Sequence, residues 1–94
     1  MTIDDIIDAV AIEYYTSRSA IFSKIKAHQV TDARHTIAYI AVNHLSMYLK
    51  DISKALQMSV SATSSGLKSI NALIETENYY RLKIERIRKR LNID

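Results

Sequence analysis

The chain contains no proline and only one glycine, Gly66, among its 94 residues. β-Hairpins and long ordered loops usually need these residue types, because glycine adopts positive φ angles and proline fixes φ in turns. Apolar residues instead recur at intervals of three and four over long stretches, which is the spacing of one helix face. The sequence therefore predicts an all-α fold, and its length predicts a single domain spanning residues 1–94.

The helical pattern divides the chain into five to six elements. A capping signal at Thr2, followed by acidic residues, opens the first of them. Thr31 and Asp32 are expected to open a long central helix, whose apolar interior indicates burial. The segment 25–30 is polar and basic and is predicted to be a loop. The expected helices span about 3–15, 17–24, 31–45, 48–56, 60–74 and 76–91.

The segment 51–70 has the pattern of a helix-turn-helix. A short amphipathic helix with Ile52 and Leu56 is followed by the polar break 57–59, and a second helix then opens with small polar residues. Such residues can approach base edges in the major groove, which a recognition helix requires. Serine and threonine also cap helices, so a purely structural role is the alternative.

The distribution of charge favours a phosphate-binding surface around this motif. The net charge is only +3, yet residues 34–74 hold four bases and a single acid, Asp51. The flanking parts are mixed, with five acids and three bases in 1–33 and four acids and six bases in 75–94. A basic stripe of this kind is typical of nucleic-acid-binding domains.

The candidate DNA-contacting residues come from this basic stripe, from the loop before it and from the start of the second helix. Arg34 is expected at the surface near the start of the central helix, although a solvated arginine would look the same. One of the hydroxyl residues is expected to be only the helix cap. The cluster 86–90 can also reflect the negative end of a helix dipole. The candidates are Lys24, Lys26, Arg34, Ser59, Ser61, Thr63, Ser64, Ser65 and Lys68.

Other function classes find little support in the sequence. Without cysteine there is no disulfide and no thiolate metal site, and His28, His35 and His44 lack metal-ligand spacing. No glycine-rich phosphate loop or other catalytic constellation is present, so we expect neither an enzyme nor a bound cofactor or metal. No apolar run is long enough for a membrane span, and the acidic N-terminus is unlike a secretory signal. We expect a cytoplasmic protein, associated with the nucleoid if it binds DNA. The six tyrosines are expected to be packing residues.

With its helices laid end to end, the chain resembles the C-terminal DNA-binding domain of DnaA, the bacterial replication initiator, from about residue 3 to residue 91. Members of that family open with a helix ending in a tyrosine pair, as at 13–15, followed by a short helix and a basic loop, as at 23–26. An Ala-Arg pair then begins the central helix, as at Ala33 and Arg34. The resemblance implies that the basic loop and this arginine contact the minor groove and phosphates, and that residues 51–70 are the helix-turn-helix.

The chain departs from the family at the start of the recognition helix. The family carries an Arg-Asp-His-[Ser/Thr]-Thr-Val signature there, and this chain has Met58 to Thr63 with the sequence MSVSAT. Arginine that bonds guanine through two hydrogen bonds is worth about 1–3 kcal/mol of discrimination. We therefore expect that the family's usual binding box is not recognised.

Two hypotheses follow from the sequence. The first is a small stand-alone protein that binds duplex DNA and regulates replication or transcription, without the ATPase module of an initiator. The alternative is a protein-interaction or homodimerising adaptor that has lost sequence-specific reading, with the face of residues 80, 84, 87 and 91 as its interface. A basic surface around 61–68 favours DNA, whereas an exposed apolar patch including Met58 and Val60 favours protein.

Overall fold

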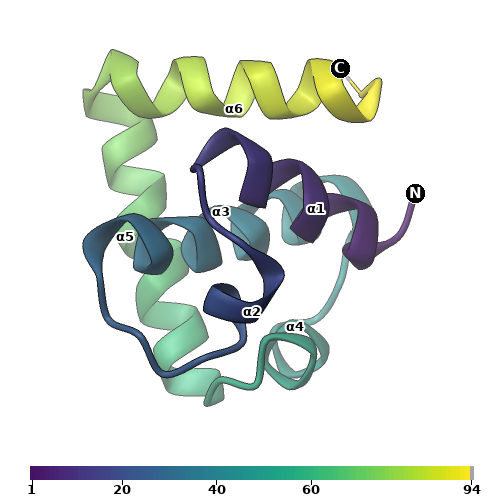
Figure 1. The fold of residues 1–94 in the computed structure, drawn as a ribbon, viewed down its shortest axis with the longest axis vertical. Coiled ribbons are helices and arrows are strands. Elements are labelled where there is room, and N and C mark those ends of the chain that lie inside the picture. The colour runs from purple at the N-terminus through teal and green to yellow at the C-terminus, as the bar shows by residue number, and fades with distance from the viewer. Residues whose placement is uncertain (94) are drawn as a thin grey trace.

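The computed structural model describes residues 1–93, which form six α-helices and no β-strand (Figure 1). The all-α fold predicted from the sequence is confirmed. The helices are α1 (Ile3–Glu13), α2 (Arg18–Ile21), α3 (His28–Leu45), α4 (Leu49–Leu56), α5 (Val60–Thr76) and α6 (Asn78–Leu91).

The first helix begins at the expected signal. The Thr2 hydroxyl accepts a hydrogen bond from the backbone amide of Asp5, and the Asp5 carboxylate accepts one from the Thr2 amide at 2.8 Å. This reciprocal pair satisfies two amides that the helix itself leaves free. It sets the start of α1 so that Ile6 and Val10, both fully buried, face the core.

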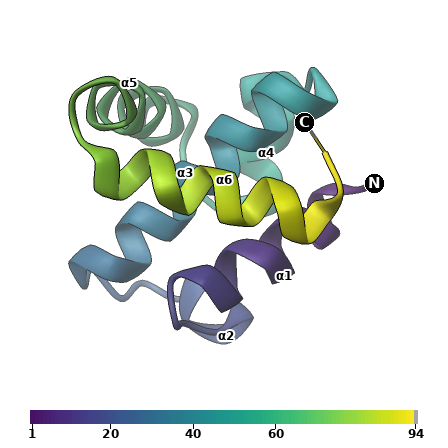
Figure 2. The same ribbon diagram turned by 90° about the horizontal axis from the view of Figure 1, so that it is seen from above.

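The central helix α3 lies in the middle of the molecule and packs against both α1 and α5 (Figure 2). Ile37 and Ile40 on this helix have no exposed surface. The helix begins at His28, three residues before the predicted start, and its N-cap Ala27 makes no side-chain hydrogen bond. The predicted opening at Thr31 and Asp32 is therefore wrong. Asp32 is buried instead, and its carboxylate accepts a 2.8 Å hydrogen bond from the Tyr80 hydroxyl.

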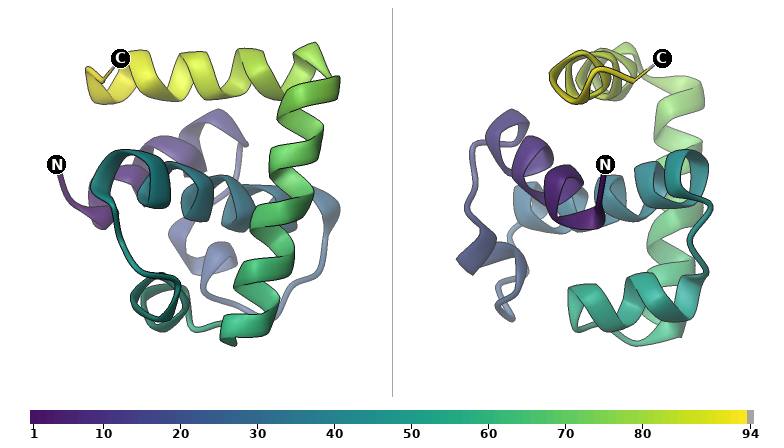
Figure 3. Two further views of the ribbon diagram at one scale, coloured as in Figure 1. Left: turned by 180° about the vertical axis from the view of Figure 1, so that it is seen from behind. Right: turned by 90° about the vertical axis from the view of Figure 1, so that its right-hand side faces the viewer.

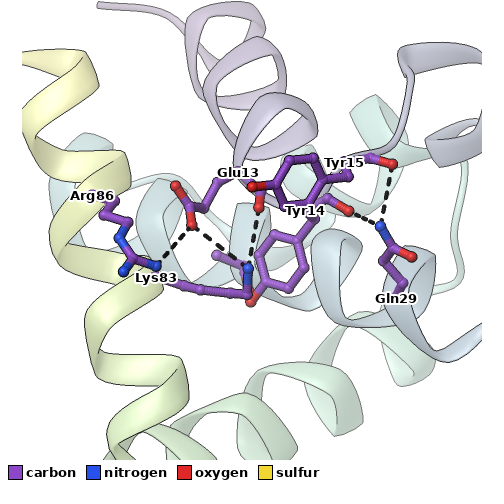
Figure 4. A network of polar contacts seen from close by, with 7 residues as sticks. Glu13, Tyr14, Tyr15, Gln29, Lys83 and Arg86 are labelled. Atoms are coloured by element: carbon purple, nitrogen blue, oxygen red, sulfur yellow. Dashed lines mark hydrogen bonds and ion pairs between the residues drawn. The ribbon is translucent and has the colours of Figure 1, made fainter.

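The last helix, α6, lies across α1 and is held there by a buried charge (Figure 4). Lys83, only 6% exposed, donates a 3.1 Å hydrogen bond to the Glu13 carbonyl at the end of α1. Its ammonium also lies 3.6 Å from the Glu13 carboxylate and 4.8 Å from the centre of the Tyr14 ring. A cation at this position satisfies a helix C-terminus and its dipole.

The apolar face of α6 packs against the rest of the molecule. Tyr80, Ile84 and Ile87 are buried within the molecule, and Leu91 is partly buried. The face considered as a dimer interface from the sequence is therefore part of the core in this chain. None of the helices within residues 1–93 combines the length and apolarity that crossing a membrane requires. In the same residues, no cluster of histidine and acidic side chains is arranged to hold a metal ion.

Candidate nucleic-acid interface

The two helices α4 and α5 are joined by a three-residue turn, as the sequence predicted. Gln57 ends α4 in the left-handed region at φ 58°, and the Met58 amide donates to the Ser53 carbonyl at 2.9 Å. Ser59 then caps α5, its hydroxyl accepting from the Ala62 amide at 3.0 Å. Ser59 is thus the hydroxyl residue that serves as the helix cap. The left-handed residue lets the chain reverse within one turn.

Thr63 connects the two helices of the motif from the inside. It is 1% exposed, and its hydroxyl bonds the Ser53 hydroxyl at 2.8 Å and the Ser59 carbonyl at 2.9 Å. The predicted contact between Thr63 and DNA therefore needs correction, because its only polar atom in the side chain faces α4. Threonine one turn into α5 fixes how the two helices cross.

The outward face of α5 carries the remaining candidates. Ser61, Ser65 and Lys68 are exposed and follow one another at intervals of four and three residues, which places them on one helix face. Ser64 is half-buried at the edge of that face. Val60, 50% exposed, is the apolar residue beside them, whereas Met58 packs partly against the core. The surface around 61–68 is therefore polar, with one base, Lys68, and a limited apolar part.

Arg34 does not lie at the surface as predicted. Its residue is 9% exposed, and its guanidinium donates hydrogen bonds to four backbone carbonyls of the α2 region. Burial lowers the pKa of Arg34 from its ordinary value, yet a guanidinium stays charged at neutral pH. The accepting carbonyls belong to Ile21, Ile25 and Ser23, each at 2.8 Å, and to Ala20 at 3.1 Å.

These four bonds fix the loop that carries Lys24 and Lys26. Both lysines are exposed, and they lie between or beside the carbonyls that Arg34 holds. A planar guanidinium with five donors suits this arrangement, which a lysine ammonium could not reproduce. Arg34 was predicted to lie at the surface because the sequence near a helix start does not show whether an arginine faces solvent or a loop that folds back onto the helix.

The loop and the N-terminal end of α5 lie at the same end of the molecule, opposite α6 (Figures 1 and 3). Two sets of candidates thus share one end of the fold: the loop lysines and the α5 face. Lys50 and Lys54, which were not among the predicted candidates, are also exposed, at a spacing of four residues on α4. The first helix of a helix-turn-helix crosses the DNA backbone, so its exposed lysines could have been predicted from the sequence as phosphate contacts.

The position of α5 depends on a close crossing with α3. A Cβ atom added to Gly66 would lie 2.2 Å from Cδ2 of His35, so only glycine allows the ring and the α5 backbone to approach this closely. Burial of the His35 ring at this crossing lowers the pKa of His35 from its ordinary value of 6.5, which favours the neutral ring. The only glycine of the chain therefore sets the depth at which α5 sits on the core.

The amino-acid sequence of this chain is similar to that of known proteins. The family model described as bacterial dnaA protein helix-turn-helix matches residues 3–70. The chromosomal replication initiator protein DnaA of Nautilia profundicola is 29% identical over 94 residues, and that of Campylobacter jejuni subsp. doylei is 27% identical. Each match covers 99% of this chain but only 22% and 21% of the relative, so the chain spans about a fifth of their length. Because the family model covers well over half of the residues, the chain belongs to the bacterial DnaA helix-turn-helix family.

Proposed function

We propose that this chain binds double-stranded DNA with α5 in the major groove and the loop 22–27 on an adjacent stretch of backbone. The observation that carries the proposal is the exposed face of Ser61, Ser65 and Lys68 on the second helix of a DnaA-family helix-turn-helix. Residues at the start of a recognition helix contact base edges in this motif. Ser59 and Ser64, at the edge of that face, are proposed to contact phosphate.

The loop lysines and Arg34 have different parts in this proposal. Lys24 and Lys26 contact the phosphates, since both are exposed beside each other. Arg34 and Thr63 act through other residues: the first holds the loop and the second holds α5 on α4. Contacts to phosphate dominate such an interface, so affinity depends strongly on salt.

The biological role that fits is a small stand-alone regulator of replication or transcription. The DnaA relatives are named as chromosomal replication initiator proteins. Support comes from the retained fold together with the altered start of α5, where MSVSAT replaces the signature. We further propose that the 94 residues fold as one domain, since Lys83 on α6 bonds Glu13 on α1.

A protein-interaction module is the alternative, favoured by the exposed Val60 beside the α5 face. A fluorescence-anisotropy titration with a mixed-sequence duplex at two salt concentrations separates the two. DNA binding predicts a linear fall of log K with log salt, with a slope of about −0.9 for each phosphate neutralised. Lys68→Ala should reduce that slope by about 0.9, because Lys68 would neutralise one phosphate. Lys89→Ala on α6 is the matched control and should leave it unchanged. No binding of the parent protein at low salt would favour the alternative.

A further inference from the structure

A second basic surface lies on α6, away from the proposed DNA-binding end. This helix carries six bases and one acid, Glu85. Arg86, Lys89 and Arg90 are exposed along it. Figures 1 and 3 place α6 at the opposite end of the molecule from the N-terminus of α5. A duplex bound to α5 would therefore leave these bases free, and the proposed DNA binding does not explain them.

Three depressions lie along the junction of α1 and α6, the first of them also bordered by the start of α3, and we refer to the three together as the α1–α6 groove. The first is aromatic, with Tyr15, Tyr79 and Lys83 among its walls and a volume of about 680 Å³. The second is lined by the bases Arg86, Lys89 and Arg90 around the Glu13 carboxylate. Arg90 also lines the third depression, so the second and third depressions lie next to each other.

Large apolar side chains are exposed beside these bases. Tyr15 is 88% exposed, Tyr79 is 59% exposed and Leu82 is 48% exposed. The expectation that the six tyrosines are packing residues is wrong for Tyr15 and Tyr79, and also for Tyr48, which is 74% exposed on another part of the chain. Aromatic and arginine side chains together are enriched in protein–protein interfaces and in their hot spots.

The backbone holds Tyr15 in place at the rim. Its φ angle is 54°, in the left-handed region that bulky side chains rarely adopt. The Gln29 amide bonds the carbonyls of both Tyr14 and Tyr15 and so stabilises this conformation (Figure 4). This conformation ends α1, because the Thr16 amide donates a 2.9 Å hydrogen bond to the Ala11 carbonyl, as at other helix ends that use a left-handed residue. The Lys83 ammonium lies 6.0 Å from the centre of this ring, which places the ring at the wall of the aromatic depression.

The far end of the groove argues for a peptide rather than a nucleic acid. Asp5 and Asp8 line the third depression together with Ile12, which is 54% exposed. A phosphate backbone is negative along its whole length and would meet two carboxylates here, of which Asp8 is paired with Arg18 at 2.9 Å. A peptide can instead place an apolar anchor against Ile12 and its acidic residues beside Arg90. We propose that the α1–α6 groove, from Tyr15 and Tyr79 to Arg90 and Ile12, binds an acidic peptide segment of a partner protein that carries aromatic or aliphatic anchors.

The test selects random displayed peptides on the full chain and counter-selects on the double variant Lys89→Glu/Arg90→Glu. A labelled synthetic copy of an enriched peptide is then titrated against the parent, this double variant and Tyr79→Ala. Both altered sites are exposed, and circular dichroism melts verify that each variant folds. Should Tyr79→Ala fail to fold, Leu82→Ala replaces it. Lys68→Glu, on the proposed DNA-binding face, is the matched control.

The expected result is a set of peptides that combine acidic with aromatic or aliphatic residues. Their affinity should fall at least tenfold on Lys89→Glu/Arg90→Glu, fall on Tyr79→Ala, and remain unchanged on Lys68→Glu. Enrichment that is equal on the parent and the double variant would overturn the proposal, as would enriched peptides without acidic residues. Loss of duplex binding by Lys89→Glu/Arg90→Glu, or displacement of the peptide by a mixed-sequence duplex, would make this surface a nucleic-acid contact instead and would also overturn it. Because the DNA-binding variant is a separate arm, the two proposals can fail independently.

Discussion

His35 and Gly66 meet where α3 crosses α5, and a Cβ on Gly66 would lie 2.2 Å from the His35 ring. Two effects oppose each other at this crossing. An alanine would improve the helix propensity of α5 by about 1 kcal/mol. It would also force the ring or the helix to shift, and such overpacking costs roughly 1–3 kcal/mol.

We therefore expect Gly66→Ala to lower the free energy of unfolding in the parent protein. In a His35→Ala background the obstacle is gone, and the same substitution should become stabilising by up to about 1 kcal/mol. Chemical denaturation of the four proteins of this double-mutant cycle measures the coupling. Equal effects of Gly66→Ala in both backgrounds would show that the crossing is not as close as the structure has it.

Stability should fall in mild acid. Burial lowers the pKa of His35, and burial together with the charge of Arg88 lowers that of His44. The unfolded chain then binds more protons than the folded protein once the pH drops below about 6.5, so protonation favours unfolding. Melting temperatures measured down to about pH 5 should decline, and His35→Gln should reduce the decline to the part due to His44. A melting temperature that rises as the pH falls through this range would contradict the predicted direction of the two pKa shifts.

Arg34→Ala should weaken DNA binding and lower the melting temperature together. The substitution removes four hydrogen bonds to a buried charged group, and one such bond is worth about 1.5–3 kcal/mol. Arg34→Lys should recover only part of the loss, since one ammonium cannot reach all four carbonyls. Lys24→Ala/Lys26→Ala is the comparison, and it should weaken binding without a change in melting temperature. If Arg34→Ala melts like the parent, the guanidinium does not hold the loop.

The usual DnaA box should bind no better than a scrambled duplex. Met58, Ser59 and Val60 stand where the family signature has Arg-Asp-His, and none of them can form the paired hydrogen bonds that arginine makes to guanine. Competition between the two duplexes at one salt concentration measures the preference. A ratio above about tenfold, or 1.4 kcal/mol, would mean that other residues of α5 read the box.

Local signals predicted the helices well and their partners poorly. The helix start at Thr2 and the break at 57–59 were predicted from signals local in sequence, and the structure contains both. One of the hydroxyl residues near the start of the second helix was expected to be its cap, and the structure shows that this residue is Ser59. The start of α3 was missed because Ala27 offers no side-chain cap, whereas Thr31 and Asp32 do. Periodicity could not show this.

The errors in the candidate site have a common cause. Arg34 and Thr63 were assigned by residue type, and hydroxyl and guanidinium groups serve backbone carbonyls as readily as DNA. Their real partners are separated from them in sequence: Arg34 bonds carbonyls 9 to 14 residues away, and Thr63 bonds Ser53 ten residues away. Lys68, whose place depends only on the period of α5, is exposed as its spacing predicts.

The bond from Lys83 to the Glu13 carbonyl also bears on how the protein emerges from the ribosome. The two residues are 70 positions apart, so at about 5–20 residues per second the end of α1 is synthesised roughly 4–14 s before its partner. During that interval the Glu13 carboxylate and the last carbonyls of α1 lack the partner that Lys83 provides, and α6 does not yet cover α1. Native packing of the α1 face under α6 thus has to follow synthesis of α6, and a nascent chain stalled after α5 would expose that face.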